Sequence, residues 1–128
     1  MFRELVINST LTDTLLRIVI LDITTFHGAT ADLEDLARLI KSDPFGGNQF
    51  YETVTAQLEV TVTRGRSAER SLETLLSVYH YRLTVVLGLP VDDFYVSTLQ
   101  SLARLKEQVD ELALYLLIRS IDRELPRP

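Results

Sequence analysis

Apolar positions recur at steps of three and four residues along most of the chain, which is the spacing of helices that bury one face. The first such run covers residues 11–26. Thr10, with Asp13 three residues later, resembles a capping box at its start, and Gly28 stands where a C-terminal cap glycine belongs. The pattern predicts a first helix that ends before Gly28.

A second and a third helix follow from the same spacing. The second opens at Thr30 and is stopped by Asp43 and Pro44, because the residue before a proline is pushed out of the helical region. The third opens at Ser67 and stops at Gly88. Its apolar stripe comprises Leu72, Leu75, Leu76, Tyr79, Leu83, Val86 and Leu87.

The last predicted helix is the longest and extends from about residue 93 to about residue 124. Asp92 is placed to cap it, and Val91 and Val96 have the spacing of a hydrophobic staple around that cap. Neither glycine nor proline interrupts the pattern before Pro126. The main stripe of this helix comprises Leu99, Leu102, Leu105, Val109, Leu112 and Leu116.

Residues 48–65 carry two conflicting patterns. Apolar and polar side chains alternate over residues 54–62, as in a half-buried strand, and this stretch is rich in β-branched residues. The ends are helical in character, with Asn48 as an N-cap, Arg64 in the last turn and Gly65 as a terminal glycine. A strand would also need a partner strand, which only residues 2–7 or 17–26 offer. We therefore favour a helix over residues 49–64.

These elements predict an all-α fold. The chain is expected to form a single domain over residues 1–128, built as a bundle of four to five helices with a long C-terminal helix. The alternative is a small α+β protein, with a hairpin or strand at residues 53–64 packed on the C-terminal helices. Both versions contain the same C-terminal helical hairpin.

Composition limits the classes of function. None of the 128 residues is cysteine, which excludes thiol catalysis, thiolate metal ligands and disulfides. The net charge of −5 makes binding of nucleic acid unfavourable. The first residues lack the pattern of a signal peptide, and no apolar run approaches the roughly 20 residues that span a bilayer. We expect a soluble, cytoplasmic protein without a membrane span.

The C-terminal helix is apolar around its whole circumference at residues 112–118, which read LALYLLI. A surface helix of a monomer keeps one polar face, so a second surface must cover this one. The helix is roughly 48 Å long, against a radius of gyration of roughly 14 Å for a compact domain of this size. We expect it to overhang its own domain and to pack against a second copy of the chain. The alternative is a bent helix covered by the first and third helices. The predicted interface comprises Leu112, Leu114, Tyr115, Leu116, Leu117, Ile118 and Ile121.

The sequence contains few candidates for catalysis. His27 follows a predicted helix end, where it serves most simply as a structural cap. His80 shares a predicted helix face with Glu73, Ser77 and Thr84, which could supply a carboxylate and hydroxyls, but we favour a solvated polar face because no oxyanion donor or nucleophile elbow accompanies them. Adjacent acidic residues diverge on helices, and no phosphate-binding glycine motif occurs. We expect no catalytic residue, no metal site and no cofactor.

Residues 33–58 resemble a helix-turn-helix, with LARLI in the first helix and QFYETVTAQL in the second. The resemblance implies a dimeric DNA-associated regulator in which residues 30–66 form the reading segment. Arg64, Arg66 and Arg70 are the local basic cluster of the chain, and they would then contact the DNA backbone.

Taken together, these patterns favour a non-enzymatic, oligomerising structural or accessory subunit that acts through protein–protein contacts of its C-terminal helical hairpin. Its expected partner is a copy of itself, with a different protein as a further candidate. The DNA-associated regulator is the alternative, and an enzyme that uses His80 with Glu73 is a third class.

Overall fold

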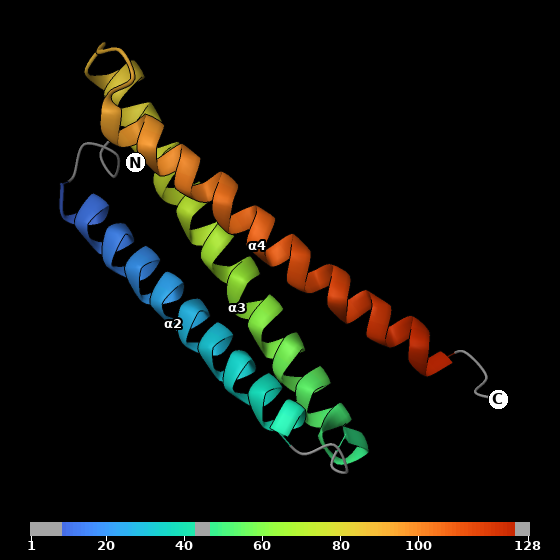
Figure 1. Cartoon of the computed structure of the whole chain (residues 1–128). Helices are drawn as coiled ribbons and strands as arrows, with labels where there is room; N and C mark the ends of the chain where they lie inside the picture. The colour runs from blue at the N-terminus through green and yellow to red at the C-terminus, as the bar shows by residue number, and fades with distance from the viewer. Residues whose placement is uncertain (1–8, 43–46, 125–128) are drawn as a thin grey trace.

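The computed structural model describes residues 9–42 and 47–124, and within these ranges the chain is helical and contains no strand. Three α-helices and one π-helical segment follow in order: α2 (Ser9–Ser42), α3 (Gly47–His80), η1 (Tyr81–Val86) and α4 (Asp93–Glu124). Figure 1 shows the α-helices as long rods of similar length. The all-α class is confirmed. The alternative strand at residues 53–64 is wrong, because that stretch lies inside α3.

The predicted count of four to five helices is not confirmed, because two predicted breaks do not occur within the described residues. α2 runs through Gly28, and α3 runs through Gly65 and Ser67. A glycine inside a helix costs only about 1 kcal/mol relative to alanine. Burial of neighbouring side chains against other helices offsets that cost, as at Phe26 and Ala29 on either side of Gly28. The predicted stop at residues 43–44 lies outside the described residues.

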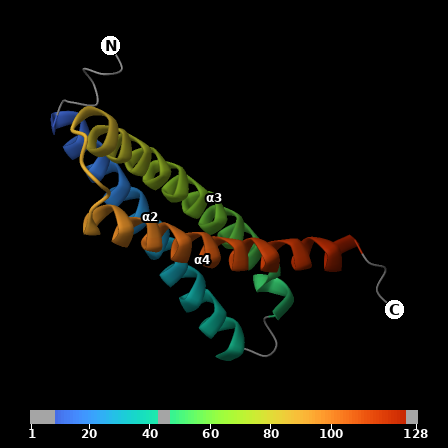
Figure 2. The same ribbon diagram turned by 90° about the horizontal axis from the view of Figure 1, so that it is seen from above.

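α3 is the central element of the fold. It packs against both α2 and α4, and consecutive helices run antiparallel (Figure 1). Figure 2 shows α4 diverging from α2 toward its C-terminal end. All three helices contribute to one hydrophobic core. Its buried side chains are Val19, Phe26, Ala68, Leu72, Leu75, Leu76, Leu102, Leu105 and Val109.

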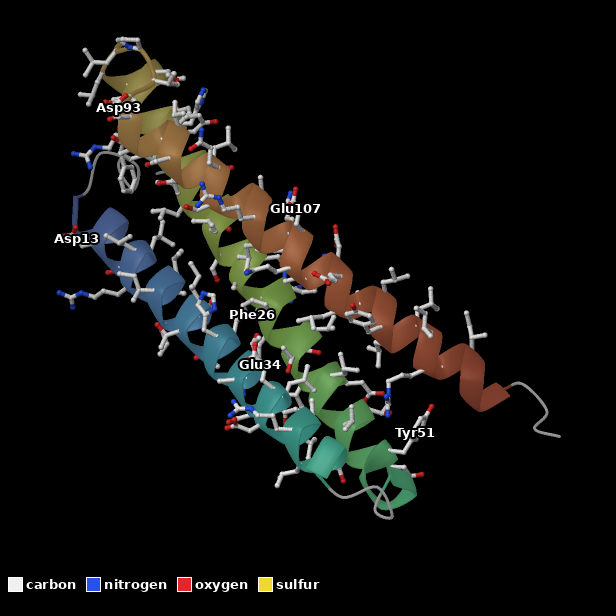
Figure 3. All side chains as sticks on the ribbon, in the orientation of Figure 1. Asp13, Phe26, Glu34, Tyr51, Asp93 and Glu107 are labelled. Atoms are coloured by element: carbon white, nitrogen blue, oxygen red, sulfur yellow. The ribbon has the colours of Figure 1, made fainter. Side chains whose placement is uncertain are left out.

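Gly65 marks a close approach of the three helices. A Cβ atom built on it would overlap Val109 Cγ2 of α4 and would lie 2.9 Å from Phe26 Cε1 of α2. Both neighbouring side chains are fully buried, so neither can turn away into solvent. Phe26 points from α2 toward α3 (Figure 3). The predicted role of Gly65 as a helix terminus is therefore wrong: its missing side chain makes room for residues from both neighbours.

Threonine hydroxyls find hydrogen-bond partners when the alternating stretch is buried as a helix. Thr55 and Thr61 are buried, and each hydroxyl donates to the carbonyl oxygen four residues earlier, at 3.0 and 2.7 Å. Such bonds satisfy a buried hydroxyl within its own helix. Val60, by contrast, is 46% exposed. The buried row of α3 follows steps of three and four residues: Thr55, Leu58, Thr61, Gly65, Ala68, Leu72 and Leu75.

The predicted stop near Gly88 is confirmed. Its φ of +65° lies in the left-handed region that favours glycine. The amide of Leu89 donates back to the carbonyl oxygen of Leu83 at 2.9 Å, which closes the end of η1. α3 therefore ends through a π-helical segment, and the chain then reverses into α4.

Asp92 caps α4 and ties it to the end of α3. Its Oδ1 accepts a hydrogen bond from the Tyr95 amide at 2.9 Å, and its Oδ2 accepts one from the Tyr79 hydroxyl. The hydroxyl bond is the main cause that lowers the pKa of Asp92 below its ordinary range, followed by the Tyr95 bond. The same contact raises the pKa of Tyr79.

Gly65→Ala is expected to lower the free energy of unfolding by about 1–2 kcal/mol, because overpacking of a rigid core outweighs the gain in helix propensity. Gly28→Ala is the matched control, since a Cβ atom there meets nothing within 4 Å. It should stabilise the protein by about 0.5–1 kcal/mol. Urea unfolding monitored by circular dichroism measures both changes. Equal effects of the two substitutions would contradict the close approach at Gly65.

Tyr79→Phe is expected to lower the midpoint of thermal unfolding at neutral pH, because it removes the hydroxyl that binds ionised Asp92. The pKa of Asp92 is lower in the folded than in the unfolded chain, so this stabilisation is complete above about pH 4 and disappears as the pH falls through the lowered pKa. Thermal unfolding of wild type and variant between pH 2 and pH 7 should therefore converge at the acidic end. Tyr115→Phe, on an exposed tyrosine, is the control and should change little. A difference that persists unchanged at pH 2 would contradict the role of Asp92.

Candidate interaction surface

Two ion pairs between exposed side chains link one flank of α4 to α3. Lys106 Nζ lies 2.9 Å from Glu73 Oε1, and Arg66 Nη1 lies 2.9 Å from Asp110 Oδ1. Arg66 also lies 3.1 Å from Oε1 of Glu69, whose side chain is largely buried. Hydrogen bonds to Asp110 and to Glu73 are the main causes that raise the pKa of Arg66 and of Lys106, respectively. These contacts join one flank of α4 to α3.

Arg119 anchors the C-terminal part of α4 to the start of α3. Its Nε donates to Thr55 Oγ1 at 2.9 Å, its Nη2 donates to the Tyr51 carbonyl at 3.0 Å, and its guanidinium lies 4.2 Å from the centre of the Tyr51 ring. The Tyr51 hydroxyl donates in return to the Arg119 carbonyl at 3.0 Å. Figure 3 shows Tyr51 beside this part of α4. The predicted overhang is therefore wrong as far as Arg119, because α3 is equally long and accompanies α4.

The side of α4 turned away from the core carries an apolar surface, which we call the outer face. Near its C-terminal end Leu114 is 54%, Leu117 56%, Ile118 45% and Ile121 48% exposed. Glu107 lies on the side of α4 away from α2 (Figure 3). At 100° per residue, seven exposed apolar residues share a sector about 100° wide. The outer face comprises Val96, Leu99, Ala103, Leu114, Leu117, Ile118 and Ile121.

Only some of the predicted interface residues lie on the outer face. Leu114, Leu117, Ile118 and Ile121 lie on the outer face. Leu112 is half-buried and packs against the hydrophobic core. Leu116 is half-buried. Tyr115 is exposed, with its hydroxyl 3.4 Å from Glu111 Oε1.

Sequence reasoning missed the first part of the outer face, formed by Val96, Leu99 and Ala103. Leu99 was assigned to the buried stripe, yet it is 46% exposed. The signal that could have identified them is their angular position around the helix. These three residues fall in the same sector as Leu114 and Ile121, about 140° from the direction of the buried residues of α4.

Shallow hollows lie between α2 and α4, where the two helices begin to diverge. One, of about 300 Å³, is lined by residues that include Ile23, His27, Arg104 and Gln108. Its neighbour, of about 200 Å³, shares His27 and Gln108 and is bordered by Glu111. Open space separates the side chains of α2 and α4 here. Leu72 of α3 also lines the first hollow.

Two of the residues predicted to share a helix face with His80 have other partners. The Glu73 carboxylate is paired with Lys106, and the Thr84 hydroxyl donates to the His80 backbone carbonyl at 2.7 Å. The His80 ring lies 5.4 Å from the Tyr95 ring. His27 lies within α2 and borders the hollows, so its predicted role as a helix cap is wrong.

The segment that resembles a helix-turn-helix has a different geometry. Its two parts belong to α2 and α3, which are each 34 residues long and pack against each other as antiparallel neighbours. Arg66 of the basic cluster is engaged by Glu69 and Asp110, whereas Arg64 and Arg70 are exposed. DNA binding stays a prediction that this geometry does not strengthen.

Within the described ranges no cluster of three or more His, Cys, Asp or Glu side chains is arranged to hold a metal ion. None of the described helices is both long and apolar enough to cross a membrane. Searches of protein-family models, curated proteins and solved structures found no match to this chain.

Arg119→Met is expected to loosen the last turns of α4 while the core around Val109 stays closed. The substitution removes two hydrogen bonds and a cation–π contact but retains an aliphatic stem of similar length. Amide hydrogen exchange should accelerate by about tenfold or more over residues 112–121. Arg70→Met, at an exposed arginine of α3, is the control and should leave that region unchanged. Uniform acceleration along the whole chain would show that Arg119 contributes to global rather than local stability.

Proposed function

We propose that this chain is a non-enzymatic structural or accessory subunit that acts through protein–protein contacts of its C-terminal helical hairpin. The observation that carries the proposal is the C-terminal part of the outer face. There Leu114, Leu117, Ile118 and Ile121 are all about half exposed. Their spacing of three, one and three residues is that of a seam along which two helices pack.

Energetics support a partner for this surface. Completing the burial of a half-exposed Leu or Ile contributes about 1 kcal/mol, so four such residues provide several kcal/mol to an association. Monomeric proteins expose single apolar residues without consequence, but contiguous apolar patches are typical of interaction sites. Within the described chain the packing of α4 on α3 leaves these four side chains about half exposed.

Rigidity of the site gives further support. The Arg119 contacts and the two α3–α4 ion pairs orient α4 before any partner arrives. A helix that is already ordered loses little conformational entropy on binding. A second copy of the chain is the simplest partner, since most soluble oligomers are symmetric assemblies of one chain. A different protein that offers an apolar helix is the other candidate.

The first test is the absolute mass in solution, measured by light scattering after size exclusion across a hundredfold range of concentration. A stable multiple of 14.6 kDa supports self-association. A monomer at every concentration would remove the homo-oligomer from the proposal and would leave a different protein as the partner.

Leu114→Glu combined with Ile118→Glu is expected to dissociate the oligomer, because two carboxylates would be buried without partners in the interface. Ile18→Glu combined with Leu21→Glu is the matched control. It places the same two charges on α2 at an Ile and a Leu that are 44% and 65% exposed, and it should preserve the mass. If the α4 variant keeps its mass and loses only thermal stability, Leu114 and Ile118 belong to the core of a single chain.

A further inference from the structure

The outer face of α4 has an apolar patch at each end and a polar middle. Val96, Leu99 and Ala103 form the first patch, and the second begins at Leu114, as described above. Between them the same face presents Glu107 together with Asp110, which Arg66 already engages. An apolar surface that is interrupted in this way cannot pack against a uniformly apolar helix without burying carboxylates. Its partner must be polar in the middle as well.

The spacing of residues along this face is symmetric about its centre. Steps of four and three residues alternate through the positions Val96, Gln100, Ala103, Glu107, Asp110, Leu114, Leu117 and Ile121. This series reads the same from either end. A second α4 laid antiparallel about the midpoint between residues 108 and 109 therefore places Val96 opposite Ile121 and Ala103 opposite Leu114. Small Ala103 against large Leu114 is the size match that lets facing layers interdigitate.

We propose that two copies of this chain pair through α4 in an antiparallel, two-fold symmetric arrangement centred between residues 108 and 109. The inference rests on the proposed function and specifies its partner and geometry. In such an isologous interface each contact occurs twice, so the first apolar patch of each copy covers the second patch of the other. Both patches are then buried by a single mode of contact.

Charge complementarity favours this arrangement. In the antiparallel register Arg104 of one copy and Glu111 of the other lie about 3 Å apart along the helix axis, on the flank of the seam, and the pair occurs twice. Within the described residues Arg104 has no ion pair, and Glu111 is contacted only by the Tyr115 hydroxyl at 3.4 Å. Both groups are therefore available to a partner.

A parallel pair of the same helices lacks this match. It would place Glu107 beside Glu107 of the second copy, a like-charge contact, and it would turn the two Arg104 side chains to opposite flanks of the seam, away from Glu111 of the other copy. The antiparallel pair also brings acidic residues together at its centre, Glu107 against Asp110. There, however, Arg66 lies 2.9 Å from Asp110 and offsets part of this repulsion.

Cysteine cross-linking tests the register directly, because the chain contains no cysteine of its own. The double variant Ala103→Cys/Leu114→Cys should form intermolecular disulfides under mild oxidation, since the two positions face each other across the interface. The single variants Ala103→Cys and Leu114→Cys are the controls. In the antiparallel pair, identical positions lie about 16 Å apart along the axis and should not cross-link. Cross-linking by the single variants would overturn the proposal in favour of parallel pairing.

Charge reversal gives an independent test that keeps the apolar patches intact. Arg104→Glu and Glu111→Arg should each weaken dimerisation by roughly tenfold, and the double variant should restore it, as measured by sedimentation equilibrium. Failure of the double variant to recover would contradict the predicted pair. A wild-type dimer that shows neither the disulfide nor the recovery overturns the antiparallel geometry while self-association stands. A wild-type monomer at all concentrations overturns the pairing and self-association together.

Discussion

The approach of all three helices at Gly65 is the constraint on which the rest of the structure depends. Phe26 from α2 and Val109 from α4 occupy the space that a side chain at residue 65 would fill. Because Gly65 carries no side chain, α2 and α4 can each approach α3 closely at this level. The arrangement then positions the rest of the core around this level, with leucines of α3 packed between the other two helices.

A central α3 has to present buried surface to two neighbours, and its sequence does so with unusually many small and hydroxyl-bearing residues. Thr55 and Thr61 are buried although polar, because their hydroxyls return to backbone carbonyls of the same helix. Thr61 Oγ1 also lies 3.4 Å from the Ala29 carbonyl oxygen of α2, which the Gln57 side chain also reaches at 3.2 Å. The β-branched stretch thus serves helix packing and not strand pairing.

The same arrangement leaves one side of α4 without a neighbour. Ion pairs with Lys106 and Asp110 join the helix to α3, and Arg119 extends this attachment to its last turns. α4 is therefore held firmly along one flank and is open along the other. Its exposed seam is apolar at both ends and charged at the centre. Such a seam favours a matching helix over nonspecific association, because the charged centre penalises misaligned partners.

The sequence by itself determined the all-α class, the helical hairpin around Gly88 and Asp92, and the apolar character of residues 114–121, because glycine geometry, capping and periodicity act over only a few residues. Tertiary structure decided what local patterns could not. Gly28 and Gly65 read as helix ends, yet packing against neighbouring helices continues the backbone through both. Thr61 is polar, yet it is completely buried against α2. Leu112 and Leu117 both belong to the predicted interface, and the packing of α4 on α3 places one against the core and the other in solvent. That packing depends on contacts between residues far apart in the chain, which no local pattern specifies.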